Sequence, residues 1–480
     1  MRVSLQGTGK RPSVGDEMTS HRPILFCCTH STGQATSSLV LAGEFAARGV
    51  KNLWFASDDN HRAAVAGLSG ASEVGFVSTG PVNPRVAPTM WDDETYRSIT
   101  QRSRWKGNRA RLRQLMDPVH HADRFRQLDA AVQRIQPALM VINNLCIHGI
   151  QVAMKRGVPY VITGSSLASD IWQFDLPDDY PVPYSGLPRR MNLRQRIGNR
   201  LFRHRNLLSM LDPALLRTVG AMLKATDELG LDRRQLQQRA WMEEAELVLC
   251  FSVFGLDYPF PHPPKLQMVG AMVPPLPQNP VPGETDRWLD AHPSVVFIAF
   301  GTITRLTKAE VRAVVDVARR LGERHHVLWK LPREQQRFLP PAAELPANLR
   351  VEDWLPSQYD VLAHSNVRVF FGHGGNNSFH EGIYFGKPSL VRPLWFDCLD
   401  HAVRAVDSGV GLSVAPGTMD PAEIHSKLTA LLDDTSFRAR AEHFAQIQHE
   451  AGGVRRAADL ILRCAAVTSA GQDEQPAVQR

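Results

Sequence analysis

The segment 367–388 carries the residues best suited to chemistry. It reads VRVFFGHGGNNSFHEGIYFGKP, which is an apolar strand, a loop of glycines and short polar side chains, and then a helix. Gly374 and Gly375 let the backbone approach a ligand closely, and Asn377 and Ser378 are favourable capping residues for the helix. The unpaired N–H groups at a helix start carry positive potential and attract phosphate. The segment therefore predicts a diphosphate site that needs no metal ion.

Two further side chains of this segment have matching chemistry. His373 can donate a hydrogen bond to a phosphate oxygen and so stabilise the negative charge of a leaving diphosphate. Glu381, about one turn further on, can accept hydrogen bonds from ribose hydroxyls. Taken alone, a His-Gly-Gly turn is more often a plain connection between strand and helix, and His380 is expected at the surface.

The spacing of His373, Gly375, Asn377, Ser378 and Glu381 resembles the donor-binding signature of family 1 glycosyltransferases, the UDP-glycosyltransferases and their bacterial macrolide-type relatives. The resemblance extends over most of residues 246–412. It implies a metal-independent enzyme of the GT-B fold, in which two Rossmann-like domains face each other across a cleft. It also implies a nucleotide-diphosphate sugar, a UDP-sugar by preference, as co-substrate with no separate cofactor.

The same resemblance assigns roles to residues outside the segment. Trp354 matches a Trp that stacks on the nucleotide base, and Gln358 matches the Gln that follows it, although this loop is one residue longer than usual. Core packing is the alternative role for Trp354. The sequence FGTIT resembles a Phe-Gly-Ser loop and places Thr302 or Thr304 near the terminal phosphate.

Asp397 falls at the acidic position that contacts sugar hydroxyls in this family. The family follows that acid with Gln, whereas this chain has Cys398. One amide that would bond a sugar hydroxyl is therefore missing, and the resemblance does not assign UDP-glucose as the donor.

The loop after the first strand departs from the family. There the family carries a His that removes the proton of the acceptor hydroxyl, and the matching residue here is Gln34, which cannot act as a base. His30, four residues earlier, is the candidate substitute, with a structural role as its alternative. The carboxylate that often follows the fourth strand is replaced by Asn143 and Asn144. Other nearby candidates are Asp117, His120, His121 and Asp123.

The elements that must position these residues alternate between strands and helices. Apolar runs of strand length occur at 23–29, 52–56, 138–148, 159–166, 246–252, 295–301, 326–331, 349–354, 367–372 and 388–394. Helical patterns separate many of these runs, which is typical of parallel sheets wrapped by helices. In such α/β folds ligands bind at the carboxyl ends of the strands, where the candidate residues lie.

At 480 residues the chain has room for two domains, and dense prolines between 257 and 283 mark the connector. We predict a loose tail (1–20), an N-terminal acceptor-binding domain (21–256) with an Arg-rich helical insertion (181–245), a Pro-rich linker (257–285), a C-terminal nucleotide-sugar domain (286–465) and a second tail (466–480).

Composition narrows the class of protein. Apolar residues make up 43% and charged residues 21%, as in soluble globular proteins. The six cysteines show no CxxC spacing, and neither a signal peptide nor an apolar run of about 18 residues is visible. We therefore expect a cytoplasmic protein with reduced thiols. The net charge is +7, but the basic residues are mostly interleaved with acids, so nucleic acid is not an expected partner.

One stretch, 189–205, has seven arginines and no acid, spaced among apolar residues at helical intervals. A solvated helix face is one interpretation. The other is contact with an anionic substrate or surface, which would make this stretch a peripheral membrane contact.

These observations favour the inverting transfer of a hexose from a nucleotide-diphosphate sugar to a hydroxyl of a lipophilic small molecule. One alternative is another enzyme of the same fold, either a nucleotide-sugar epimerase or a lipid-intermediate glycosyltransferase. The other is a catalytically impaired protein that binds a nucleotide sugar and serves as a partner, as Gln34 suggests.

Overall fold

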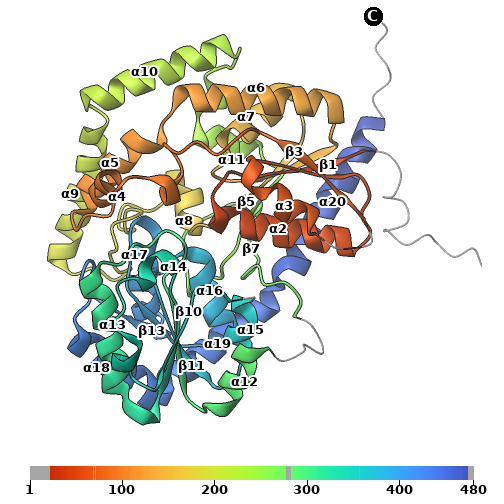
Figure 1. Ribbon diagram of the computed structural model, residues 1–480. Coiled ribbons are helices and arrows are strands. Elements are labelled where there is room, and N and C mark those ends of the chain that lie inside the picture. Colours follow the sequence, from red (N-terminus) through yellow and green to blue (C-terminus); the bar gives the residue numbers. More distant parts are fainter. Residues whose placement is uncertain (1–21, 69, 71, 277–282, 356, 474–480) are drawn as a thin grey trace, which may run out of the picture.

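The computed structural model describes residues 22–68, 70, 72–276, 283–355 and 357–473, so the expected N-terminal tail lies outside the described residues. Two sheets form the centres of two domains (Figure 1). The first has seven strands in the order β3-β2-β1-β4-β5-β6-β7, and the second has six in the order β10-β9-β8-β11-β12-β13. All strand pairs are parallel, which confirms the predicted α/β class with two Rossmann-like domains.

Short apolar runs form the first sheet because helices cover both of its faces. Its strands are β1 (Ile24–Cys27), β2 (Leu53–Ser57), β3 (Val74–Ser78), β4 (Leu139–Asn143), β5 (Tyr160–Gly164), β6 (Leu247–Cys250) and β7 (Leu266–Met268). The sequence signal missed β3 and β7. The latter lies within the range expected to be an irregular linker, where prolines on both sides hide a three-residue strand that pairs with β6.

One face of this sheet packs on α2 (Thr32–Ala47), and the other packs on α6 (Pro118–Ile135) and α7 (Ile147–Arg156). The expected helical insertion is present as α9 (Leu193–Ser209) and α10 (Pro213–Glu228). The remaining α-helices of this domain are α3 (Arg62–Ala66), α4 (Asp93–Ile99), α5 (Arg104–Leu115), α8 (Ala168–Ile171) and α11 (Gln238–Glu244).

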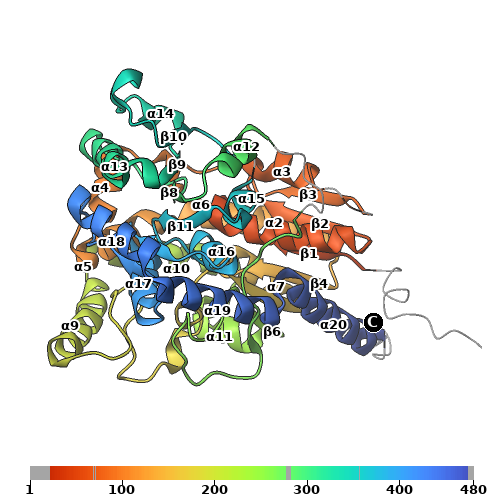
Figure 2. The same ribbon diagram turned by 90° about the horizontal axis from the view of Figure 1, so that it is seen from below.

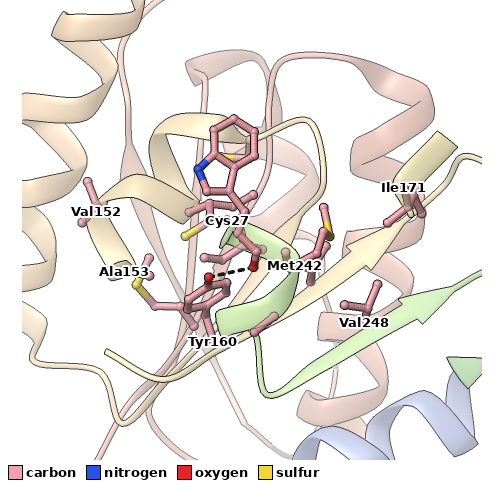
Figure 3. Packing of buried hydrophobic residues seen from close by; sticks show 14 of the residues in the cluster. Cys27, Val152, Ala153, Tyr160, Ile171, Met242 and Val248 are labelled. Atoms are coloured by element: carbon pink, nitrogen blue, oxygen red, sulfur yellow. Dashed lines mark hydrogen bonds between the residues drawn. The ribbon is translucent and has the colours of Figure 1, made fainter. Parts of the chain in front are cut away.

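A dense core anchors the strands of the first domain. Figure 3 shows part of it, with Cys27, Tyr160 and Met242 among the labelled side chains. The Tyr160 hydroxyl donates to the Trp241 carbonyl oxygen at 2.8 Å, so its polar atom is satisfied within an apolar cluster. This bond fastens α11, the last helix of the expected insertion, to β5.

The second sheet consists of β8 (Val295–Ala299), β9 (His326–Lys330), β10 (Leu349–Glu352), β11 (Val367–Gly372), β12 (Ser389–Val391) and β13 (Gly411–Ser413). Helices α13 (Lys308–Leu321) and α18 (Pro421–Asp433) cover one face. Helices α12 (Glu284–Ala291) and α15 (Gln358–Ala363) pack on the other. The remaining α-helices are α14 (Arg333–Gln336), α16 (Asn376–Tyr384), α17 (Phe396–Asp407) and α19 (Thr435–Ala451).

The last helix, α20 (Gly453–Asp473), lies beside α2 of the first domain (Figures 1 and 2). Its residues Ala457, Ala458 and Ile461 pack in the same core as Phe26 of β1. The sequence placed residues up to 465 in the second domain and a loose tail after them, whereas the helix continues to Asp473 and its apolar side completes the first domain. Within the described residues no helix is long and apolar enough to span a membrane.

Candidate active site

The strands of the second sheet present the candidate donor residues at their carboxyl ends. Thr302 follows β8, Trp354 follows β10, His373 follows β11 and Asp397 follows β12. Because β10, β8, β11 and β12 belong to one parallel sheet, these loops lie along a single edge. The sequence pattern therefore predicted one continuous surface from positions that are far apart in the chain.

The His373 ring lies between two glycines that have no room for a side chain. A Cβ on Gly301 would lie 2.6 Å from His373 Cε1, and one on Gly375 would lie 2.5 Å from Nε2. Among the described residues, His373 Nδ1 is buried without a hydrogen-bond partner. Burial lowers the pKa of His373 to about 4, so the ring is neutral at neutral pH. A neutral imidazole with an unused nitrogen can bind a phosphate oxygen as a hydrogen-bond donor.

Helix α16 begins without a side-chain cap, and its N-cap residue is Gly375. Asn377 and Ser378, expected as caps, lie inside the first turn instead. Asn377 bridges the two lobes, because its Nδ2 donates to the Gly33 carbonyl at 2.6 Å and its Oδ1 accepts from Ser37 Oγ at 3.2 Å. Since no side chain caps the helix, its first N–H groups can bind an anion.

Glu381 is the centre of a hydrogen-bonded group beside that helix start. Its Oε2 accepts from Gln358 Nε2 at 2.7 Å, and Tyr359 also bonds it. Burial raises the pKa of Glu381 to about 7, although Gln358, Tyr359 and Lys330 favour the charged form. Trp354 is 65% exposed and its ring centroid lies 4.3 Å from Lys330 Nζ, so the ring is a solvent-facing platform and not part of the core.

The two threonines after β8 differ in availability. Thr304 is buried and its hydroxyl donates to the Phe300 carbonyl oxygen at 2.6 Å. Thr302 is exposed. Of the two expected phosphate contacts, Thr302 is thus the one whose hydroxyl is accessible to a ligand.

Asp397 lies at the start of α17, directly after Phe396, whose φ of 32° is in the left-handed region. Burial, followed by the charge of Asp400, raises the pKa of Asp397 to about 7. The Cys398 side chain is only 1% exposed, and a Cβ on Gly374 would lie 3.1 Å from the Cys398 carbonyl oxygen. Cys398 therefore packs beneath the glycine turn, which gives the backbone of that turn its support.

Two polar residues of this region were not identified from the sequence. Asn376 is only 5% exposed, and neither atom of its amide has a hydrogen-bond partner among the described residues. His380, four residues later, was expected at the surface but is buried, because α17 and α19 cover α16. Its ring lies 5.7 Å from that of the buried His401. Asn376 was detectable in principle, as the one polar residue of the loop that received no role.

In the first domain, Gln34 is hydrogen-bonded to Asn143, the residue that stands where the family often has a carboxylate. Asn143 Nδ2, at the end of β4, donates to Gln34 Oε1 at 2.8 Å. His30 lies toward the opposite neighbour, with its Nδ1 3.9 Å from Asp58 Oδ2, just past the end of β2. This divergence follows from strand order, because β1 lies between β2 and β4.

The surroundings of His30 combine burial with a fixed ion pair. Asp58 Oδ1 lies 2.5 Å from Arg124 Nη2. Burial raises the pKa of Asp58 to about 6, with Arg124 opposing that shift. Burial and then the nearby His120 lower the pKa of His30 to about 4. At neutral pH His30 is therefore a neutral imidazole beside a carboxylate–guanidinium pair.

The other histidines and acids near this loop have structural contacts. Asp117 accepts from the His120 backbone N–H at 3.1 Å as the N-cap of α6, and His121 Nε2 lies 2.7 Å from Gln151 Oε1. Asp123 is paired with Arg126 at 3.2 Å. In the described part of the chain no three His, Cys, Asp or Glu side chains form a group able to hold a metal ion.

The two lobes touch on both sides of the candidate site. Besides the Asn377 bridge, the buried Asp400 carboxylate accepts from the backbone N–H groups of Tyr184 at 2.6 Å and Gly186 at 2.7 Å. A cavity of about 30 Å³ between the lobes borders this contact and is lined in part by Arg104, Tyr184, Trp395 and Phe396. It has room for about one water molecule, so a sugar or acceptor entering here requires the lobes or loops to move.

Solved structures share this two-lobed arrangement. The structure of the glycotransferase of kitacinnamycin aligns with a TM-score of 0.66 and 20% sequence identity, covering 92% of this chain and 99% of that one. The likeness shows that the fold is the GT-B fold of glycosyltransferases.

The chain is also similar in sequence to curated glycosyltransferases. UDP-glucuronosyltransferase 2A3 of Cavia porcellus is 26% identical over 313 residues, which are 63% of this chain and 56% of the relative. The 2-hydroxyacylsphingosine 1-beta-galactosyltransferase of Rattus norvegicus is 30% identical over 224 residues, 45% of this chain and 39% of the relative. The chain spans about half the length of the curated relatives it matches.

The family model described as UDP-glucoronosyl and UDP-glucosyl transferase matches residues 134–452, which include the second half of the first domain, from β4 onward, and nearly all of the second domain. This range contains every residue of the candidate donor site, whereas His30, Gln34 and Asp58 lie outside it. The chain therefore belongs to the UDP-glucoronosyl and UDP-glucosyl transferase family.

Proposed function

We propose that this protein transfers a hexose from a UDP-sugar to a hydroxyl of a lipophilic small molecule, with inversion at the anomeric carbon and without a metal ion or separate cofactor. The observation that carries the proposal is the set of unused polar groups around the uncapped start of α16. Membership in the family supports a UDP-sugar as the donor. The acceptor class rests on the apolar composition of the first lobe.

Each part of a UDP group has a matching partner in the donor site. The exposed Trp354 ring offers a stacking surface for the base, and the Glu381 carboxylate accepts from ribose hydroxyls. The diphosphate fits the first turn of α16, with His373 as an additional donor. These groups are already fixed in place, so they stabilise the charge that develops on the leaving UDP with little reorganisation.

His30 is the group we propose to accept the proton of the acceptor hydroxyl. The acceptor oxygen attacks the anomeric carbon from the face opposite UDP, the bond from that carbon to the phosphate oxygen breaks, and UDP leaves with the electron pair. The start of α2, which follows His30, contacts the donor lobe, because the Gly33 carbonyl accepts from Asn377. The neutral ring has a free lone pair, and the Asp58 carboxylate 3.9 Å away stabilises the imidazolium that forms.

A second candidate function, binding of a nucleotide sugar without catalysis, is supported by the hydrogen bond between Gln34 and Asn143. Neither amide can accept a proton at neutral pH, and they stand where related enzymes have a base and its carboxylate. Under this hypothesis the chain binds a nucleotide sugar without transferring it and serves as a partner of another transferase. Sugar transfer or donor hydrolysis by the purified chain, lost in His30→Ala, would exclude it.

Two enzymatic alternatives on the same fold are separable by their products. A nucleotide-sugar epimerase changes the sugar in the absence of any acceptor, whereas the proposed transferase leaves it unchanged. A lipid-intermediate glycosyltransferase yields product only with a lipid-linked acceptor. Product analysis with no acceptor, a hydroxylated small molecule and a lipid-linked acceptor distinguishes the three.

Calorimetric titration with UDP tests the donor site directly. Wild-type protein is expected to bind, and His373→Ala and Glu381→Ala are each expected to weaken binding by about tenfold to a hundredfold, as for lost hydrogen bonds to charged groups. Glu323→Ala is the matched control, because Glu323 is an exposed carboxylate just before β9, at the opposite edge of the same sheet. No binding by the wild type, or equal binding by all four proteins, contradicts the assignment.

A further inference from the structure

Helix α9 reverses the usual arrangement of a surface helix, because its buried side chains are polar and its exposed side chains include large apolar ones. Its buried residues are polar: Asn199 Oδ1 accepts from the Val182 N–H at 2.8 Å, and its Nδ2 donates to the Tyr180 carbonyl at 2.9 Å. At the last residue of the helix, Ser209 Oγ accepts from Trp105 Nε1 at 2.8 Å. Surface helices ordinarily bury an apolar stripe and expose polar residues. Here hydrogen bonds hold the helix to the protein.

The solvent-facing side of the same helix is apolar. Leu193 is 74% exposed, Ile197 51% and Leu201 50%, and their spacing of four residues places them in one stripe. Beyond the stripe, the last turn of α9 and the turn into α10 expose four more large apolar side chains: Leu207, Leu208, Met210 and Leu211. Single exposed leucines are common, but a continuous group of this size marks a contact surface.

Arginines flank the stripe on both sides. At 100° per residue, Arg196 and Arg200 project on one side of Leu193, Ile197 and Leu201, and Arg194 and Arg205 project on the other. All four are exposed, and α9 contains no acid. Within the described part of the chain no carboxylate lies in ion-pair distance of these four, whereas Arg189 and Arg203 are paired with Asp179 and Asp178. We call the three apolar residues and four flanking arginines the α9 surface.

Helix α9, which carries the α9 surface, lies at the edge of the first domain in both ribbon views (Figures 1 and 2). Its helix rests on α5, and α10 rests on α5 and α6, so both belong to the acceptor lobe. A flat body that approaches this side meets the stripe and the arginines of the α9 surface together.

We propose that the α9 surface docks the protein on an anionic lipid bilayer. The leucine and isoleucine side chains enter the boundary between headgroups and acyl chains, while the arginine guanidiniums bind headgroup phosphates as planar two-pronged donors. Charge complementarity selects this occupant, because the surface carries four arginines that form no ion pair in the described part of the chain, and it carries no anion. A second copy of the chain is a poor match, since it would bring the same four cations against these four.

Docking through the α9 surface does not depend on the donor site. Its benefit to catalysis rests on the proposed function, in which the acceptor is lipophilic. A lipophilic acceptor concentrates in a bilayer, and the surface belongs to the lobe that would bind it. Docking would therefore shorten the path of the acceptor from the bilayer into the cleft.

Vesicle co-sedimentation with the full chain tests the proposal. Wild-type protein is expected to bind vesicles of phosphatidylcholine mixed with phosphatidylglycerol at least tenfold more tightly than vesicles of phosphatidylcholine alone. Two combined variants are each expected to lose at least tenfold of that affinity: Leu193→Ser with Ile197→Ser and Leu201→Ser, and Arg194→Gln with Arg196→Gln, Arg200→Gln and Arg205→Gln.

The matched control removes the same number of positive charges elsewhere. Arg312→Gln with Arg319→Gln, Arg320→Gln and Arg324→Gln changes four exposed arginines on or next to α13 of the other domain, and is expected to bind anionic vesicles like the wild type. Unchanged thermal unfolding of both α9 variants shows that they remain folded. Wild-type protein that does not prefer anionic vesicles, α9 variants that bind like wild type, or a control that loses as much as they do overturns the proposal. So does a wild-type dimer that the serine variant abolishes.

Discussion

Residues 373–378 after β11 (the β11 loop) and residues 28–37 after β1 (the β1 loop) each comprise a connection and the start of the next helix, at the carboxyl edge of their sheet. The polar side chains of these two segments differ in whether they have hydrogen-bond partners. The β11 loop leaves its groups unused: His373 Nδ1 and the Asn376 amide have no partner among the described residues, and α16 has no side-chain cap. The β1 loop pairs its Gln34 with Asn143. Buried polar groups without partners are rare in proteins and indicate a ligand or water. The β11 loop thus has polar groups available to a ligand, whereas the β1 loop pairs its polar groups within the protein.

The difference between the two loops indicates which of them binds the donor and which one supplies the base. The two loops touch through Asn377, Gly33 and Ser37, so a donor held by the first lies close to the second. Within the β1 loop, Gln34 is committed to Asn143, and His30 is the titratable side chain beside an acid. Three experiments, ordered by the size of the expected effect, test whether binding and proton transfer are divided between the loops in this way.

Replacing His30 by Ala is expected to have the largest effect. Loss of a general base lowers kcat by roughly a hundredfold to ten-thousandfold. The affinity for UDP is expected to stay unchanged, since His30 belongs to the other lobe. Steady-state kinetics and calorimetry of the same variant separate the two quantities.

Gln34→Ala is the matched change in the same loop. It leaves the buried Asn143 amide without its partner, which lowers the free energy of unfolding by about 1–3 kcal/mol, but kcat is expected to stay within about tenfold of wild type. If instead Gln34→Ala abolishes transfer and His30→Ala does not, the loops are not divided as proposed and the base lies elsewhere.

The pH dependence of donor binding is expected to be smaller. Burial raises the pKa of Glu381 to about 7, and its ionised form is the stronger acceptor of hydrogen bonds from ribose hydroxyls. Binding is therefore strongest above pH 7 and weakens as pH falls through that value, by about tenfold between roughly pH 8 and pH 6. Calorimetry with UDP-glucose, in the absence of acceptor, measures this loss and the proton released on binding.

Glu381→Gln removes the titrating group while keeping a hydrogen-bond acceptor. Its affinity for UDP-glucose is expected to be lower than that of wild type above pH 7 and nearly independent of pH. A variant that keeps the wild-type pH profile would show that another group, such as Asp397 with its similarly raised pKa, controls binding.

The sequence predicted the residues of the donor site but not the contacts of the β1 loop, and the reason is physical. The donor residues share one strand, loop and helix unit or follow neighbouring strands, so the resemblance to a family signature could bring them together. The bond between Gln34 and Asn143 spans 109 positions and exists because β1 pairs with β4, which no local pattern reveals. The docking of α20 on the first domain and the burial of His380 were missed for the same reason, since both depend on helices packing across long sequence distances.

The smallest expected effect belongs to Asn376, and it is the sharpest test of the idea that the β11 loop is organised around a ligand. A buried amide without a partner costs about 1–3 kcal/mol, so Asn376→Leu is expected to raise the free energy of unfolding while weakening donor binding by about threefold to tenfold. Stability and affinity then move in opposite directions, which a purely structural residue would not produce. Comparing UDP with UDP-glucose locates the contact, because equal losses indicate the nucleotide diphosphate and a loss confined to UDP-glucose indicates the sugar. If stability falls and neither affinity changes, Asn376 supports the fold and the β11 loop is no more open than the β1 loop.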